Sequence, residues 1–235
     1  MGFWWLNEEA AREFLADPDE TPFAATDLHP DLLAGLTNDD NLYHPLCEQE
    51  PFHNPIAANK TYRWKLDECC DARLSRKWPK MFMHIEKRWK LEIFERLSDE
   101  FDDAGYWKKL GELYAAAELF HSKQDLVNSL LSSPRGQREN LMKMEERDFL
   151  ASLPHNFTVY RGFAFDNASG WSWTLDKNKA IWFANRPSGN PKRNPRVSSG
   201  TVTKTDVVAF LAGRNEQEIV VDPRFVRDIE TTPVA

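Results

Sequence analysis

The stretch WSWTLDKNKAIWFA, residues 171–184, decides the fold, because it joins a strand-like run to the start of an amphipathic helix. Ser172 places a hydroxyl between two tryptophans in the first half. Thr174 is a candidate N-cap, since its side chain can accept a hydrogen bond from the first helical turn. Apolar residues then follow at helical spacing, Phe183 among them. Taken alone, these residues are explained by a plain strand, cap and helix.

Two further motifs flank this stretch. Tyr160-Arg161-Gly162 ends a β-prone run, and Glu216-Gln217-Glu218 leads into the apolar run Ile219-Val220-Val221. An arginine at a strand end offers a planar fork of donors for phosphate or carboxylate, and a glycine beside it lets a ligand approach the backbone. In a strand, Glu216 and Glu218 would share one face and take different pKa values and roles. Alone, a salt-bridged arginine and a solvated acidic pair explain these motifs equally well.

The elements expected along the chain change type near residue 154. Apolar periodicity and X-Pro steps predict helices over residues 1–16, near 31–36 in an otherwise irregular segment, and over 62–101, 105–132 and 138–153. Residues 77–80 interrupt the third region, and residues 81–101 are expected as one helix. Strands are expected over residues 157–160, 200–204, 206–211 and 218–221. The sequence therefore predicts an α+β protein, in which a mainly helical region (1–154) packs on a C-terminal core (155–235).

Composition argues against several classes of protein. Hydrophobic residues make up 41% and charged residues 29% of the chain, as is ordinary for globular proteins. No apolar run approaches the ~20 residues that span a bilayer, and the short apolar start lacks a basic region, so we expect a cytoplasmic protein that does not enter a membrane. The three cysteines, Cys47, Cys69 and Cys70, have neither zinc-site nor disulfide-framework spacing, so no metal is expected.

The net charge of −7 is unevenly distributed. Residues 156–235 hold 11 Lys and Arg against 8 Asp and Glu, whereas residues 1–155 hold the remaining 19 against 29. The slightly basic C-terminal part suits an anionic ligand, and the acidic N-terminal part argues against nucleic acid lying on it.

Together the three motifs resemble the Arg–Ser–Glu class of mono-ADP-ribosyltransferases, which includes cholera-like and clostridial toxins and vertebrate ecto-enzymes. The order is the same: Tyr160-Arg161-Gly162, then Ser172-Trp173-Thr174-Leu175-Asp176 with Ala180 and Phe183-Ala184, then Glu216-Gln217-Glu218-Ile219-Val220. This chain departs from the commoner Ser-Thr-Ser at the second motif. The resemblance covers residues 157–222, less than a third of the chain, and implies an ADP-ribosyltransferase-like β-sandwich core. Residues 1–154 have no recognised counterpart, and target recognition is their candidate role.

The resemblance implies NAD as co-substrate and a role for each site residue. Arg161 would hold the NAD phosphates. Ser172 would orient Glu218, which would hydrogen-bond the 2′-hydroxyl of the nicotinamide ribose. Glu216 would accept the proton of the incoming nucleophile, as in the arginine-modifying pattern, and Trp171 is a candidate to stack on nicotinamide. The residues expected to bind the co-substrate are Tyr160, Arg161, Gly162, Ser172, Trp173, Thr174 and Phe183.

Several alternatives remain open at the level of sequence. The acceptor is a protein arginine or a nucleic acid, and the basic loop 186–196 is either a mobile contact to NAD or the target, or a linker. A bacterial or phage toxin or effector, with an antitoxin or inhibitor protein as partner, is the leading interpretation. An NAD glycohydrolase, and a catalytically silent interaction module on the same fold, are the competing ones.

Overall fold

The structure is a computed structural model, which describes residues 28–39, 41–117, 123–164, 168–186 and 194–234. The predicted helix over residues 1–16 lies outside these ranges. The chain divides into two compact units, residues 1–99 and 100–235. This division differs from the expected boundary near residue 154, because the helices of residues 103–152 belong to the same unit as the C-terminal sheet.

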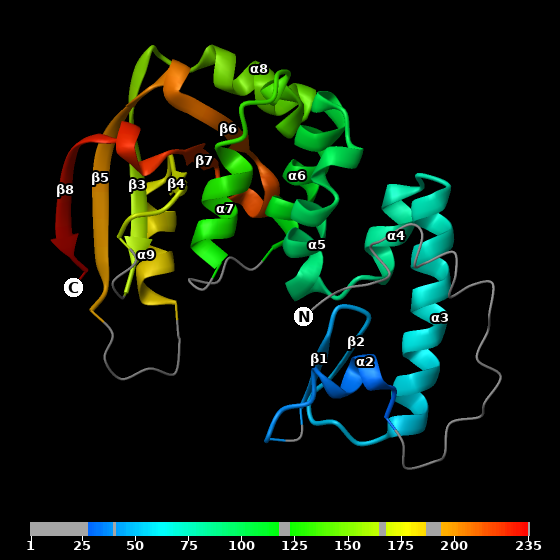
Figure 1. The fold of residues 1–235 in the computed structure, drawn as a ribbon. Coiled ribbons are helices and arrows are strands. Elements are labelled where there is room, and N and C mark those ends of the chain that lie inside the picture. The colour runs from blue at the N-terminus through cyan, green and yellow to red at the C-terminus, as the bar shows by residue number, and fades with distance from the viewer. Residues whose placement is uncertain (1–27, 40, 118–122, 165–167, 187–193, 235) are drawn as a thin grey trace. The chain divides into compact units, whose positions relative to one another are not determined.

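Unit 1 is a small hairpin accompanied by helices (Figure 1). Its elements are α2 (Pro30–Leu33), β1 (Leu42–His44), β2 (Cys47–Gln49), α3 (Pro55–Leu74), α4 (Trp78–His84), the 3₁₀ turn η2 (Lys87–Trp89) and α5 (Lys90–Arg96). The long helix α3 begins where Asn54 caps it, because the Asn54 side chain accepts a hydrogen bond from the Ala57 amide at 3.1 Å, and Pro55 occupies the first turn.

The helix expected over residues 81–101 is broken into pieces in the structure. Ile85 and Glu86 have extended backbone, with ψ of 132° and 141°. The Glu86 amide donates to the Pro45 carbonyl at 2.7 Å in the β1–β2 turn, and its carboxylate pairs with Lys65 of α3. These non-local bonds override the helical periodicity. Pro79 lies in the first turn of α4, where a missing amide hydrogen costs nothing, and therefore helps to start that helix.

Unit 2 combines helices with one antiparallel sheet. Its helical elements are α6 (Asp103–Ala116), α7 (Gln124–Leu131), the 3₁₀ turn η5 (Arg138–Leu141), α8 (Met144–Ser152) and α9 (Lys177–Asn185). Its strands are β3 (Asn156–Phe163), β4 (Ser172–Thr174), β5 (Arg196–Thr203), β6 (Val207–Leu211), β7 (Glu218–Val221) and β8 (Arg227–Pro233). The α+β prediction is confirmed, and β8 is a strand that the sequence patterns did not indicate.

The sheet has the strand order β6-β7-β4-β3-β5-β8. The described strands of unit 2 thus form one hydrogen-bonded sheet of six strands, and the ADP-ribosyltransferase-like β-sandwich stays a prediction. Strand β3 pairs with β5 along its full length, from Asn156 to Phe163. Strand β3 pairs with β4, in contrast, only at Tyr160 and Thr174. The sheet therefore has a narrow seam between β4 and β3, with three strands on each side.

Helices cover the sheet at both sides of this seam. Helix α8 lies against β6, where Phe149 stacks on Phe210 with ring centroids 4.3 Å apart and the Glu146 carboxylate accepts the Ala212 amide at 2.9 Å. Helix α9 lies against β3 (Figure 1). All five residues of β6 are buried, so the core of unit 2 extends along this strand. Among the helices that the structure describes, none combines the length and apolar character needed to cross a bilayer.

Candidate functional site

The structure brings the predicted site residues together in one pocket of unit 2. The pocket has an empty volume of about 410 Å³, which includes the space at its mouth that is open to solvent. It lies at the seam of the sheet, where β3, β4 and β7 meet the helix α9. Its lining residues are Tyr160, Arg161, Gly162, Ser172, Trp173, Thr174, Phe183, Glu216 and Glu218. Three segments that are remote in sequence therefore converge as the motif order predicts.

Strand register sets the position of the acid. Glu218, the first residue of β7, pairs with Thr174 at the end of β4 and with Leu211 at the end of β6. Ser172 pairs with Val220, at the other end of the same short ladder. Thr174, rather than the Ser172 expected to orient the acid, is thus the direct strand neighbour of Glu218.

Thr174 organises the backbone around the acid. Its buried hydroxyl donates to the Glu216 carbonyl at 2.7 Å and accepts from the Asp176 amide at 3.0 Å. The helix cap is Asp176, not Thr174 as expected: the Asp176 carboxylate accepts from the Asn178 and Lys179 amides at 2.8 and 3.4 Å. Thr174 therefore connects the end of β4 to the segment before β7, and α9 begins three residues later, at Lys177.

Glu216 precedes the strand instead of sharing it with Glu218. Its backbone is helical, with φ −96° and ψ −13°, and it ends the 3₁₀ turn at residues 213–215. Gln217 has φ of 46°, in the left-handed region. The prediction that Glu216 and Glu218 share one face of a strand is therefore wrong. A left-handed turn nevertheless places both carboxylate residues on the wall of the same pocket.

Gly162 lines the pocket, where its predicted contact with the co-substrate stays a prediction, and it also serves helix packing. A Cβ built on Gly162 would lie 1.7 Å from the Ala180 carbonyl oxygen and 2.8 Å from the Ala184 nitrogen. The backbone of α9 already occupies that space. Only glycine at this position lets the helix that carries Phe183 lie directly on β3.

Arg161 is anchored into the wall of the pocket. Its Nε donates to the Ala168 carbonyl at 3.1 Å and its Nη1 donates to the Ser172 carbonyl at 2.6 Å. Burial lowers the pKa of the Arg161 guanidinium, whereas nearby Tyr114 and Glu218 raise it. The residue is thus a fixed positive charge within electrostatic range of the acid, and its bond to Ser172 links β3 to β4 across the seam.

Tyr114 of α6 is a site residue that sequence reasoning did not find. Its hydroxyl donates to Glu218 Oε1 at 3.3 Å, and its side chain is 2% exposed. Burial raises the pKa of Tyr114 well above the usual 10, and the Glu218 charge raises it further. Tyr114 belongs to an apolar helix pattern and lies far from Glu218 in the chain, so no local signal distinguishes it from a core residue.

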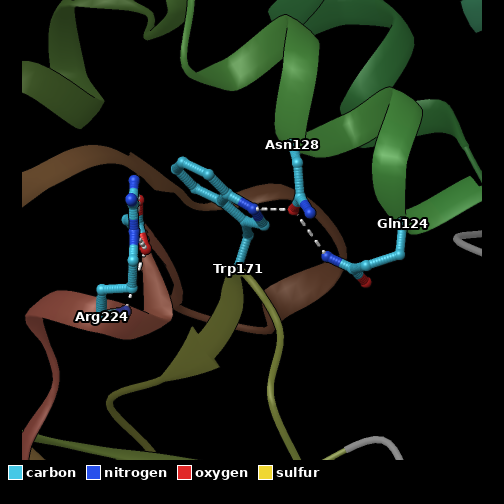
Figure 2. A network of polar contacts seen from close by, with 5 residues as sticks. Gln124, Asn128, Trp171 and Arg224 are labelled. Carbon is cyan, nitrogen blue, oxygen red and sulfur yellow. Dashed lines mark hydrogen bonds and ion pairs between the residues drawn. The ribbon is translucent and has the colours of Figure 1, made fainter.

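The aromatic residues of the motif take different roles. Phe183 lines the pocket, and its ring meets that of the exposed Trp182 edge-on, with centroids 5.0 Å apart. Trp171, a stacking candidate, is instead buried, and its indole nitrogen donates to Asn128 of α7 at 2.6 Å. Gln124 donates to the same Asn128 oxygen at 3.0 Å (Figure 2). Trp171 thus fastens the start of β4 to α7.

Two further sequence expectations concern the basic loop and metal binding. Residues 187–193 of the basic loop are outside the described ranges, so its predicted contacts with NAD or a target stay predictions. In the part of the chain that the structure describes, no group of three or more His, Cys, Asp or Glu side chains is arranged to hold a metal ion. The three cysteines, all in unit 1, are buried free thiols.

Comparisons with known protein families, with curated proteins and with solved structures find no significant match for this chain.

Proposed function

We propose that the protein is a mono-ADP-ribosyltransferase, which transfers ADP-ribose from NAD to a macromolecular acceptor. The observation that carries the proposal is the convergence of Arg161, Ser172 and Glu218, from three different strands, on one pocket. The motif order raised this expectation, and the strand order β7-β4-β3 supplies the proximity that the proposed chemistry needs.

The pocket contains the charges that cleavage of NAD requires. Breaking the bond between nicotinamide and C1′ of the ribose sends the bonding electron pair to nicotinamide and leaves positive charge on the sugar. A fixed carboxylate, here Glu218, stabilises that charge more in the transition state than in the ground state. Arg161 supplies a half-buried positive charge for the NAD phosphates. Phe183 supplies an aromatic wall for a flat ring.

Glu216 completes the transfer step in this proposal. The nucleophile of the acceptor forms the new bond to C1′, and its proton passes to the Glu216 carboxylate. The two acids lie on the same pocket wall, but on opposite sides of the left-handed turn at Gln217. This geometry supports separate roles, with Glu218 acting on the sugar and Glu216 on the acceptor. A protein arginine is the favoured acceptor, and a toxin or effector role with an inhibitor protein as partner belongs to the same proposal.

Labelled NAD tests the proposal directly. The protein is incubated with NAD labelled in the ADP-ribose half and with a cell lysate that is afterwards separated into protein and nucleic-acid fractions. We expect label in the protein fraction. Glu218→Gln should lower the rate by about 10²–10³ or more, because it removes a preorganised charge at the reacting centre. Glu230→Gln, which changes an exposed glutamate of β8, is the matched control and should act like the parent protein.

The other outcomes separate the alternatives. Label in the nucleic-acid fraction would keep the transferase and change the acceptor. Nicotinamide release without a labelled acceptor would identify an NAD glycohydrolase. Neither product, together with background NAD binding, would leave a catalytically silent module and overturn the proposal. Glu216→Gln should still release nicotinamide but lose transfer to arginine, and equal loss of both reactions would refute the role given to Glu216.

A further inference from the structure

The carboxylate of Glu218 has a partner behind the pocket wall. The Tyr114 hydroxyl lies 3.3 Å from Glu218 Oε1. Tyr114 is not one of the nine lining residues. It comes from α6, and its ring is almost fully buried. A buried tyrosine hydroxyl needs a hydrogen-bond partner, and here that partner is the acid that the proposed reaction depends on.

Helix α6 is a rigid support for this hydroxyl. A Cβ on Gly111 would lie 2.3 Å from the Leu141 carbonyl oxygen, so α6 and η5 are in direct backbone contact. On the same helix, the Trp107 indole nitrogen donates to the Arg135 carbonyl at 3.3 Å. The Tyr114 side chain therefore extends from an element that is fixed at two points, and its hydroxyl has little freedom to follow a moving carboxylate.

The protonation state suits a donor. Because burial and the Glu218 charge raise the pKa of Tyr114 well above 10, the phenol stays neutral at physiological pH and donates its proton to the carboxylate. A separation of 3.3 Å is long for a hydroxyl–carboxylate bond, and hydrogen bonds in active sites commonly tighten when the substrate is bound. Holding Oε1 in place restricts rotation of the carboxylate about its last side-chain bond.

We propose that Tyr114 is a positioning residue, which holds the Glu218 carboxylate in the orientation that stabilises the sugar cation. This inference rests on the proposed function, because it assigns Tyr114 a role in the same reaction. It extends the site beyond the three motifs to the helices of unit 2. Tyr114 does not touch the substrate in this proposal and acts only through Glu218.

The test compares two tyrosine-to-phenylalanine variants of one helix. Tyr114→Phe removes only the hydroxyl that faces Glu218, and Tyr106→Phe removes a buried hydroxyl that faces a backbone carbonyl elsewhere. Nicotinamide release is measured against NAD concentration. We expect Tyr114→Phe to lower kcat by about 10- to 100-fold with KM for NAD unchanged, because the lost interaction acts in the transition state. Tyr106→Phe should keep kcat within about twofold of the parent despite a similar loss of stability.

A double-mutant cycle in unfolding gives a readout that does not depend on activity. Tyr114→Phe, Glu218→Gln and the double variant are unfolded in urea, and we expect a coupling of about 3- to 10-fold in the unfolding equilibrium constant. If Tyr114→Phe does not fold, Tyr114→Met fills a similar volume without a hydroxyl and takes its place in both measurements.

The outcomes separate this inference from the function on which it rests. An unchanged kcat in Tyr114→Phe, beside an inactive Glu218→Gln, would overturn the role of Tyr114 and leave the transferase standing. A raised KM with unchanged kcat would also overturn it, because the hydroxyl would then act on binding. A parent protein that releases no nicotinamide would remove the function and the inference together, while the coupling measurement would still report on the contact itself.

Discussion

Gly162→Ala is the most direct test of how this fold builds its pocket. The new methyl group would lie 1.7 Å from the Ala180 carbonyl oxygen and 2.7 Å from its carbon. These are backbone atoms of α9, which cannot rotate away as a side chain would. To restore van der Waals contact, α9 and β3 must separate by more than about 1 Å along a close-packed interface.

The cost of this separation is at least that of an overpacked core. Overpacking typically costs about 1–3 kcal/mol, and a rigid backbone neighbour places Gly162→Ala at or above the upper end. For a unit of this size, about 3 kcal/mol corresponds to a fall in Tm of roughly 10 °C. The pocket should also open, because Phe183 on α9 and Tyr160 on β3 are two of its walls.

Thermal unfolding followed by circular dichroism measures the effect. Gly213→Ala is the matched control, since a Cβ there meets nothing within 4 Å, and its Tm should change by no more than about 2 °C. A Gly162→Ala protein whose Tm equals that of Gly213→Ala would refute the close approach of α9 to β3, and with it the account of the pocket wall.

Two further perturbations test other parts of the structure. Thr174→Val keeps the shape of the side chain but leaves the Glu216 carbonyl and the Asp176 amide without their hydrogen-bond partner. It should therefore lower the free energy of unfolding in urea by about 2–3 kcal/mol. Thr174→Ser, which retains the hydroxyl, is the control, and an equal loss in that variant would contradict the role of the hydroxyl. Burial lowers the pKa of His44 to about 4 from 6.5, so between these values the unfolded chain binds more protons than the folded one. The stability from neutral His44 is complete above pH 6.5 and is lost as the pH falls toward 4, on the order of 3 kcal/mol in total. His44→Gln should flatten this part of the stability–pH profile, and an unchanged slope would show that His44 is not its source.

Local patterns predicted much of the sheet and most of the pocket. The strands around Tyr160 and Glu218 and the helix after Thr174 follow from hydrophobic periodicity and β-propensity, which act over a few residues, although the cap of that helix is Asp176 and not Thr174. Strand β8 gave no such signal, because all seven of its residues are exposed and show no alternation.

The remaining differences have non-local causes. A hydrogen bond from Glu86 to the β1–β2 turn breaks a helix that periodicity alone would continue. A left-handed Gln217 removes the alternation expected of the two acids. Tyr114 contacts Glu218 because α6 packs beside the sheet. The spacing of residues within the three motifs carries no information about this packing.

The seam between β3 and β4 links occupancy of the pocket to the cohesion of the sheet. Among the described residues, the Tyr160–Thr174 pair is the one strand pairing between the two three-stranded halves of the sheet. The pocket lies across this junction, with Arg161 on one half and Glu218 on the other. A molecule that contacts both residues would add a link between the two three-stranded halves of the sheet. It would raise the melting temperature as its concentration exceeds its Kd, and it would slow amide exchange most at the residues beside the seam.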